Sequence, residues 1–277
     1  MTEDVFHPEE TRRQQDSATP SLTIKRVRQE FASRHMKLLA REIVSPGFVR
    51  LTLGGADLAD FRSDGFDDHV KLLLPAVGQE KPLLPTLVDG RPHFGEGERP
   101  TARDYTPVRW DARKGTLVLE FAVHDEGPAT LWALHAQPGQ WVGIAGPRGS
   151  MVVPTQFAWH WLLGDASALP AIERRLAELP AQARVTVRVQ LNHAADRRAL
   201  PSAAQVDLQW VDALDQAAQV LTLPADDGFI WAAGESSDMT QLRRTLLAKP
   251  GVDPKRMRIS AYWKRGAQGH HEELVEN

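Results

Sequence analysis

Arg103 and Tyr105 stand two positions apart in the segment Arg103-Asp104-Tyr105-Thr106. If this segment is a strand, both side chains point to the same side of the sheet. An aromatic ring can cover the plane of a ligand ring, and a guanidinium can bind a diphosphate, so the pair suits a flavin nucleotide. The same pattern also fits an exposed arginine next to a tyrosine at the edge of the core.

A second group of residues lies where a helix is expected to begin. His124 is followed by Gly127, Pro128 and Ala129, and Trp132 comes one turn later. Pro128 suits a first helical turn, and Gly127 lets the backbone approach a ligand closely. The free N–H groups at a helix start attract phosphate. The alternative is an ordinary junction between a loop and a helix.

Three further segments follow expected strands: Gly146-Pro147-Arg148-Gly149-Ser150, the stretch from Gly164 to Ile172, and Trp231-Ala232-Ala233-Gly234-Glu235. The second has no G-x-G-x-x-G pattern and offers only Gly164, a candidate N-cap at Ser167 and an early Pro170, so we expect looser diphosphate binding. Asp165 is unsuited to phosphate and is expected to bond within its loop. Gly234, at a strand end, would leave room for a nicotinamide. Each segment also fits a plain turn.

The C-terminal segment combines aromatic and basic residues, with Tyr262-Trp263-Lys264-Arg265-Gly266 followed by His270-His271. It could line a site for an anionic substrate, or it could be a solvated chain end. Adjacent histidines alone do not make a metal site, so we predict no bound metal. No catalytic nucleophile or general base is evident.

Residues 36–153 form short apolar segments separated by turn residues, which predicts an antiparallel barrel or sandwich. The expected strands cover 38–44, 48–53, 69–74, 103–110, 116–123 and 141–145, and one helix covers 129–136. The Gly- and Pro-rich residues 75–100 are expected to form a long surface loop. Residues 1–33 are polar and are expected to form a flexible arm with at most two helical turns.

From residue 157 onward, expected strands alternate with helices, which predicts a parallel α/β sheet. The strands cover 159–163, 185–191, 206–211, 229–233 and 258–263, and the helices cover 168–179 and 237–247. We therefore expect a flexible arm over residues 1–33, a barrel domain over 34–154 and an α/β domain with a basic tail over 155–277.

Composition excludes several classes of protein. The 277 residues are 42% hydrophobic, which supports a real core, and the net charge of -3 argues against a nucleic-acid partner. The absence of cysteine excludes disulfides, iron–sulfur clusters and thiolate zinc sites. No segment approaches the roughly 18 apolar residues of a membrane helix, and the N-terminus lacks a secretory signal pattern. We expect a soluble, cytoplasmic monomer without a membrane partner.

Taken together, these motifs resemble the siderophore-interacting protein family, the FAD-dependent ferric-siderophore reductases related to ferredoxin-NADP reductases. The resemblance runs from about Met36 to the end of the chain and includes Asp68-His69-Val70-Lys71-Leu72. It implies an N-terminal antiparallel six-stranded FAD-binding barrel followed by a parallel-sheet α/β NAD(P)H-binding domain. The implied activity passes electrons from NAD(P)H through FAD to Fe(III) in a siderophore and releases Fe(II).

The resemblance also assigns residues. The flavin would be held by Arg103, Tyr105, Thr106, His124, Gly127, Pro128, Ala129, Trp132, Gly149 and Ser150, and the nicotinamide nucleotide by Gly164, Ser167, Gly234 and Glu235. Lys71, supported by Lys264 and Arg265, would dock the anionic ferric siderophore. One departure is Asp125, where the family often has glycine.

Two questions stay open from the sequence. Arg197 and Arg198 follow the strand 185–191, which no acidic residue ends, and this favours NADPH over NADH unless both are solvated loop charges. The activity could also be that of a general NAD(P)H:flavin or quinone reductase. A non-enzymatic siderophore-binding module is a further alternative.

Overall fold

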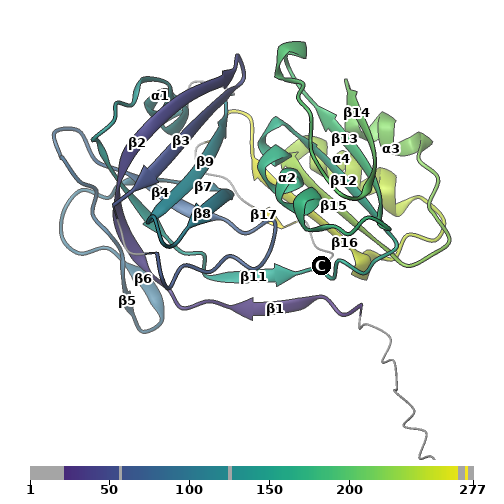
Figure 1. The fold of residues 1–277 in the computed structure, drawn as a ribbon, viewed down its shortest axis with the longest axis horizontal. Helices are drawn as coiled ribbons and strands as arrows, with labels where there is room; N and C mark the ends of the chain where they lie inside the picture. Colours follow the sequence, from purple (N-terminus) through teal and green to yellow (C-terminus); the bar gives the residue numbers. More distant parts are fainter. Residues whose placement is uncertain (1–21, 56–57, 124–126, 268–271, 274–277) are drawn as a thin grey trace, which may run out of the picture.

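The computed structural model describes residues 22–55, 58–123, 127–267 and 272–273. The chain forms two units that lie side by side, one built on an antiparallel sheet and the other on a mainly parallel sheet (Figure 1). The predicted fold class is therefore confirmed. None of the helices in the described ranges is long and apolar enough to cross a membrane.

The first unit is a curled antiparallel sheet. Its strands, in spatial order, are β7 (Thr101–Tyr105), β4 (Val70–Leu74), β10 (Trp141–Ala145), β2 (Ser33–Ser45), β3 (Phe48–Gly54), β9 (Thr116–Ala122) and β8 (Pro107–Asp111). The two edge strands, β7 and β8, are consecutive in the chain and meet at Thr106, so the chain itself closes the sheet into a barrel. Counted as one bent strand, β7 and β8 give the six-stranded barrel that was expected.

Apolar side chains from every strand fill the barrel. Met36, Leu51, Leu72, Leu119 and Ile144 are each fully buried and belong to one cluster. The helix α1 (Pro128–His135) contacts β3, β7 and β9 and adds buried alanines to the same cluster. The segment Arg103–Thr106, called the RDYT segment below, therefore lies against the buried core of the barrel.

The second unit is a six-stranded sheet, in the order β14 (Gln205–Val211), β13 (Arg184–Gln190), β12 (Trp159–Asp165), β15 (Gly228–Glu235), β16 (Met257–Trp263) and β17 (Glu272–Glu273). All pairs are parallel except β16 with β17. The helices are α2 (Leu169–Glu178), α3 (Leu214–Val220) and α4 (Ser236–Leu247), with short 3-10 turns η1 (Ala166–Ala168), η2 (Ala194–Asp196) and η3 (Pro254–Arg256). The strand order reverses between β12 and β15, the place where such sheets bind nucleotides.

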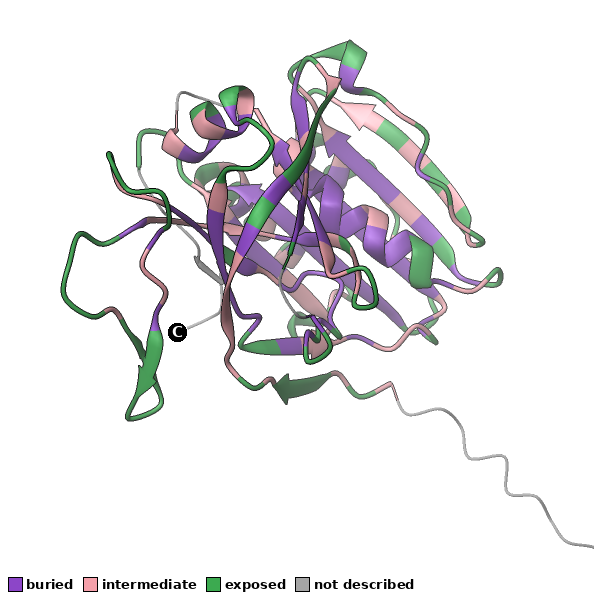
Figure 2. Cartoon of the chain, turned by 60° about the vertical axis from the view of Figure 1, so that its left-hand side comes forward, coloured by how far each residue is buried: buried purple, intermediate pink, exposed green. Residues whose placement is uncertain are grey.

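Six elements were not expected from the sequence, namely β1 (Lys25–Arg28), β5 (Thr86–Val88), β6 (Arg91–His93), β11 (Gly149–Val152), β17 and α3. The strand β1 pairs with β11, so the arm proposed for residues 1–33 contains regular structure. The expected loop 75–100 contains an exposed hairpin, formed by β5 and β6, which stands away from the barrel in Figure 2. The short helix α3 was also missed.

The loop after β13 fastens the two units together. Asp196 accepts hydrogen bonds from the Ser45 hydroxyl at 2.6 Å and the Gly47 amide at 2.8 Å, in the turn between β2 and β3. Arg198 forms ion pairs with Glu120 on β9 and with Glu173 on α2. Because Glu120 is almost completely buried, this contact lies inside the junction and fixes the units relative to each other.

Candidate functional site

The RDYT segment presents Arg103 and Tyr105 toward the inside of the barrel. They pair with Leu72 and Val70 of β4, which are buried, and residues that face each other across two strands share a side of the sheet. The Tyr105 ring packs on Phe121 with ring centroids 4.0 Å apart. The predicted common face is confirmed. Burial raises the pKa of Tyr105, so the phenol stays neutral near pH 7.

Arg103 is available for a negative ligand. Its guanidinium donates to the Ala102 carbonyl at 2.7 Å, and no carboxylate in the described ranges pairs with it. Helix α1 begins nearby in the fold with Gly127 as N-cap and Pro128 in its first turn, without a side-chain cap and without an acidic residue in that turn. Among the described residues, no side-chain cap and no first-turn carboxylate therefore neutralises the positive end of the helix.

These residues fit a flavin nucleotide, because they offer one aromatic wall, one unpaired guanidinium and one uncapped helix start. Ala129 is buried against the barrel core, and Trp132 is half-buried beside it. His124 lies outside the described residues. The assignment of these side chains to a flavin remains a prediction.

Gly149 and Ser150 are used inside the protein. The Ser150 hydroxyl donates to Asp68 Oδ2 at 2.6 Å and accepts from the Asp64 amide at 3.2 Å. A Cβ on Gly149 would lie 3.0 Å from the Val27 carbonyl oxygen of β1. Both residues therefore hold the loop around Asp68 and the β1–β11 ribbon in place, whatever they contribute to a ligand site.

The RDYT segment meets the carboxyl-end side of the second sheet. The Thr106 side chain lies next to the hydroxyl of Tyr262, near the end of β16. The Asp67 carboxylate accepts from the Trp231 indole of β15 at 3.1 Å and pairs with the Arg258 Nε of β16 at 2.9 Å. Sequence reasoning missed the role of Asp67, although it adjoins the segment that carries the family resemblance.

Asp68 is a second buried carboxyl group at this junction. Its Oδ2 accepts from the hydroxyls of Ser63 and Ser150 and from the Gly65 amide. Burial raises the pKa of Asp68 to about 6, because it outweighs the opposing effect of the bonds from Ser150 and Gly65. The neighbouring Asp67 raises the pKa further.

From this raised pKa we predict how the free energy of unfolding changes with pH. The folded protein holds the Asp68 proton up to about pH 6, whereas the unfolded chain loses it near pH 3.8, so Asp68 lowers stability as pH rises from about 4 to about 6. We expect Asp68→Asn to remove this slope and to gain on the order of 2 kcal/mol over wild type between pH 4 and pH 7.

Urea unfolding at pH 4 and at pH 7 measures the difference in stability between Asp68→Asn and wild type. Asp64→Asn is the matched control, because Asp64 is exposed on the same loop. An equal pH dependence in Asp68→Asn and wild type would contradict the prediction.

Asp165 organises the carboxyl ends of the second sheet. Its Oδ1 accepts from the amide and hydroxyl of Ser167, at 2.8 and 2.6 Å, and its Oδ2 accepts from the Glu235 amide at 2.9 Å and the Trp263 indole at 2.8 Å. The expected local bonding of Asp165 is confirmed. A Cβ on Gly234 would lie 2.7 Å from Asp165 Oδ2, so this carboxylate fills the room expected there for a nicotinamide.

Gly164 is required for a similar reason. A Cβ at this position would lie 2.4 Å from the Ala168 Cβ and 2.6 Å from the Ala233 carbonyl oxygen. The glycine lets η1 approach the end of β15, at the reversal of strand order. The surroundings of Gly164 and Ser167 are thus the edge expected to receive a dinucleotide.

The Glu235 carboxylate caps helix α4. It accepts hydrogen bonds from Ser237, from the Asp238 amide and from the Arg265 amide. Burial opposes ionisation of this carboxylate, but the donors from Ser237, Arg265 and Asp238 outweigh it and lower the pKa to about 2. The carboxylate is therefore committed to the protein, and only the backbone around Glu235 remains to face a nucleotide.

The basic side chains predicted to bind the substrate are all exposed, but they differ in whether a carboxylate pairs with them. Lys71 forms an ion pair with Asp104 of β7 at 2.7 Å, and its side chain remains 54% exposed. Lys264 and Arg265 lie exposed in the turn after β16. The pairing with Asp104, which the sequence did not reveal, partly neutralises the positive charge of Lys71.

Arg198 is not available to a nucleotide phosphate. Its guanidinium is held by Glu120 and Glu173 and lies over the Phe48 ring, 4.7 Å from the ring centroid. The expectation that Arg198 selects NADPH is therefore wrong in this structure, because an interdomain ion pair uses the charge. Arg197 is exposed and remains a candidate.

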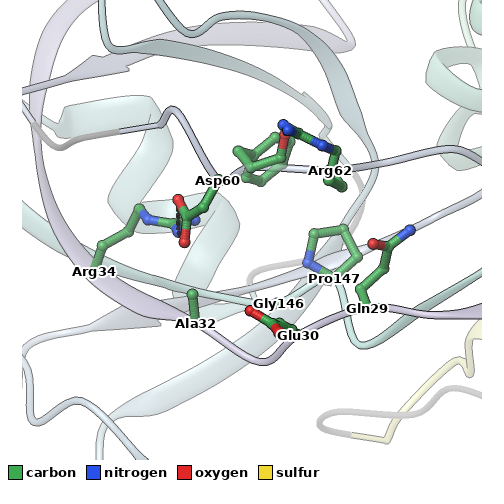
Figure 3. Close-up of a pocket in the computed structure, with 9 residues that line it drawn as sticks. Gln29, Glu30, Ala32, Arg34, Asp60, Arg62, Gly146 and Pro147 are labelled. Carbon is green, nitrogen blue, oxygen red and sulfur yellow. Dashed lines mark hydrogen bonds and ion pairs between the residues drawn. The ribbon is translucent and has the colours of Figure 1, made fainter.

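A pocket of about 250 Å³ at the start of β2 is lined by Gly146 and Pro147 of the candidate segment Gly146–Ser150, but by none of the residues assigned above to a ligand (Figure 3). Arg34 and Asp60 point toward each other across it and form an ion pair at 2.8 Å. Arg62 donates to the carbonyls of Ala59 and Phe61. Arg34 is therefore already ion-paired, whereas Arg62 bonds, among the described residues, only to backbone carbonyls.

Comparisons with known proteins cover both units. Residues 37–151 match the model described as the siderophore-interacting FAD-binding domain, and residues 157–266 match the model described as siderophore-interacting protein. The NADPH-dependent ferric-chelate reductase of Escherichia coli (strain K12) is 38% identical over 245 residues, which are 86% of this chain and 95% of that protein.

Two further proteins are similar over most of their length. The ferric vibriobactin reductase of Vibrio cholerae is 30% identical over 253 residues, covering 87% of this chain and 93% of the relative. The crystal structure of a siderophore utilization protein from T. fusca has a TM-score of 0.80 at 33% identity and covers 90% of this chain and 98% of that chain.

Proposed function

This chain belongs to the siderophore-interacting protein family, and from that premise we propose how its residues perform the activity. The protein is an NAD(P)H-dependent flavin oxidoreductase that reduces Fe(III) in a chelate through FAD. The observation that carries the proposal is the contact between Thr106 and Tyr262, because it brings the flavin motif against the carboxyl end of the nucleotide sheet.

FAD, when bound, supplies the conversion of a two-electron hydride transfer into two one-electron transfers to iron. The role of the residues of this chain is to bind FAD and to hold it in position. When FAD is bound, Tyr105 would cover one side of its ring system, Arg103 and the start of α1 would bind its diphosphate, and Thr106 with Tyr262 would close the site toward the second unit. The contacts of Asp67 with Trp231 and Arg258 join the two units beside this site.

The two units are proposed to bind different ligands. We assign FAD binding to residues 34–154 and NAD(P)H binding to residues 155–277, with the dinucleotide at Gly164, Ser167 and the backbone of Gly234 and Glu235. The substrate is a ferric siderophore, and hard oxygen ligands hold Fe(II) less tightly than Fe(III), so reduction releases iron. A cytoplasmic monomer is part of the proposal.

The nearest rival is a general flavin or quinone reductase on the same scaffold. Exposed Lys71, Lys264 and Arg265 favour an anionic ferric chelate over a neutral quinone. In steady-state competition, a ferric catecholate should inhibit quinone reduction at lower concentration than the quinone inhibits Fe(II) formation. The reverse order would favour the quinone reductase.

Lys71 is expected to guide the chelate to the flavin edge. We predict that Lys71→Ala slows reoxidation of the reduced protein by an anionic ferric chelate several-fold, about 1 kcal/mol, and leaves reduction by NADPH nearly unchanged. The effect should shrink as salt rises, because the Debye length falls from about 10 Å at 0.1 M to about 3 Å at 1 M.

The ion-pair partner of Lys71 provides the matched variant. Asp104→Asn leaves the lysine charge uncompensated and should speed the same half-reaction at low salt. Stopped-flow absorbance measures both half-reactions separately. If Lys71→Ala slows the two equally, the lysine supports the flavin or the fold and does not dock the chelate.

Arg197 is the remaining candidate for the 2′-phosphate of NADPH. It is exposed in the loop after β13, the strand whose end faces the adenosine ribose in dinucleotide-binding sheets. We predict that Arg197→Ala lowers kcat/KM for NADPH about 10-fold and changes that for NADH less than twofold. Equal losses for the two donors would assign Arg197 to the solvated loop.

A further inference from the structure

The junction between the two units contains a balanced group of buried charges. Asp67 and Asp68 are 6% and 4% exposed, and both lie on the segment that leads into β4. The charged and titratable side chains that face them are His69 on the same segment, Arg174, Arg175 and Glu178 on α2, and Arg258 and Tyr262 on β16. These side chains come from both units, so the group exists only in the folded junction.

The charges in this group sum to zero when Asp68 is ionised. Arg174, Arg175 and Arg258 contribute three positive charges, and Asp67, Asp68 and Glu178 contribute three negative ones. Burial lowers the pKa of His69 and raises that of Tyr262, so both are neutral near pH 7. An additional negative charge beside the group would leave it unbalanced in a poorly solvated place.

The two carboxyl groups differ in how they could respond to an additional negative charge nearby. Asp67 is held by Arg258 directly, so its charge has a partner. Asp68 meets a cation only through a hydroxyl, since Arg174 donates to Ser63 at 2.9 Å and Ser63 donates to Asp68 Oδ2 at 3.0 Å. Among the described residues, three donors reach Oδ2 of Asp68 and none reaches Oδ1. Oδ1 is thus the atom open to a proton.

The proposed function brings a negative charge to this place. Hydride transfer from NAD(P)H delivers two electrons and one proton, which adds one negative charge beside Thr106. Tyr262 links that position to the group, because its hydroxyl contacts Thr106 and interacts electrostatically with both carboxylates. The charge leaves again when two electrons pass to two Fe(III) and the proton returns to solvent.

We propose that Asp68 is a redox-linked proton acceptor. Its carboxylate takes one proton from solvent when the hydride arrives and returns it when the two electrons pass to two Fe(III), and no bond other than O–H forms or breaks on Asp68. The inference rests on the proposed function only in that a flavin binds at the RDYT segment.

The test is the pH dependence of the midpoint potential of the FAD-loaded protein. A reductive titration with dithionite and mediator dyes needs neither NADPH nor iron. In wild type, the potential should fall more steeply with pH above about pH 6, by the slope of one extra proton per two electrons. Asp68→Asn should lose this extra slope, and the exposed-loop control Asp64→Asn should keep it. Identical curves for wild type and Asp68→Asn overturn the inference.

A second measurement covers the case in which Asp68→Asn does not hold FAD. The infrared difference spectrum of wild type, reduced minus oxidised, should contain a new protonated-carboxyl band that shifts in heavy water. Its absence at pH 7 overturns the inference. If wild type binds no flavin at all, both the proposed function and the inference are overturned. If the flavin is present but its midpoint potential shows no extra slope that depends on Asp68, only the inference is overturned.

Discussion

Replacing Glu120 by glutamine is expected to lower the free energy of unfolding by about 2–4 kcal/mol. The Glu120 side chain is 1% exposed and is ion-paired with Arg50, at 2.7 Å, and with Arg198. Removing one member of a buried group of charges leaves the others without compensation, which typically costs about 3–5 kcal/mol. We expect less than the full cost because the two arginines are about a fifth exposed.

Chemical unfolding at pH 7 measures the effect, and Glu42→Gln is the matched control. Glu42 also pairs with Arg50, but at 3.7 Å and with a side chain that is 64% exposed. Its replacement should change stability by less than about 0.5 kcal/mol. Equal effects of the two substitutions would show that the interdomain ion pairs do not fasten the units.

Replacing Arg103 by alanine is expected to weaken FAD binding about 10- to 100-fold while the chain stays folded. A guanidinium that binds a diphosphate through charge-assisted hydrogen bonds contributes about 1.5–3 kcal/mol, which corresponds to this range. The fold should persist because Arg103 has no ion-pair partner in the described ranges and bonds only to the Ala102 carbonyl.

Fluorescence titration of the apoprotein with FAD gives the affinity, and circular dichroism checks the fold. Arg109→Ala is the matched control, since Arg109 follows the same motif but is exposed on β8. It should bind FAD like wild type. Unchanged affinity in Arg103→Ala would remove Arg103 from the site, and a parallel loss in both variants would point to surface charge in general.

The barrel and the placement of the RDYT segment could be predicted because strand alternation and turn residues are local signals. The same holds for the helix start at Pro128 and for the alternation of strands and helices after residue 157. The hairpin at Asp89 and Gly90 carried a usable signal, an Asp-Gly pair directly after the apolar residues Leu87 and Val88, and both turn residues adopt positive φ. The many prolines and glycines around it favoured a loop instead.

The roles of Arg198 and Asp67 could not be predicted, because they depend on which distant residues the fold brings together. Arg198 reaches Glu120, 78 positions earlier, and Trp231 reaches Asp67 across 164 positions. A sequence shows that a charge is present but not whether another charge already neutralises it. The same limit applies to Lys71, whose partner Asp104 lies on the next strand.

The most direct test of the central claim is an absorbance spectrum of the purified protein under argon. We expect a yellow protein with non-covalent FAD, whose flavin absorbance one equivalent of NADPH removes. Two equivalents of a ferric siderophore should then restore it, with two Fe(II) trapped by a ferrous chelator for each NADPH. A protein without flavin, a flavin that NADPH does not reduce, or a reduced flavin that the ferric siderophore does not reoxidise would contradict the account.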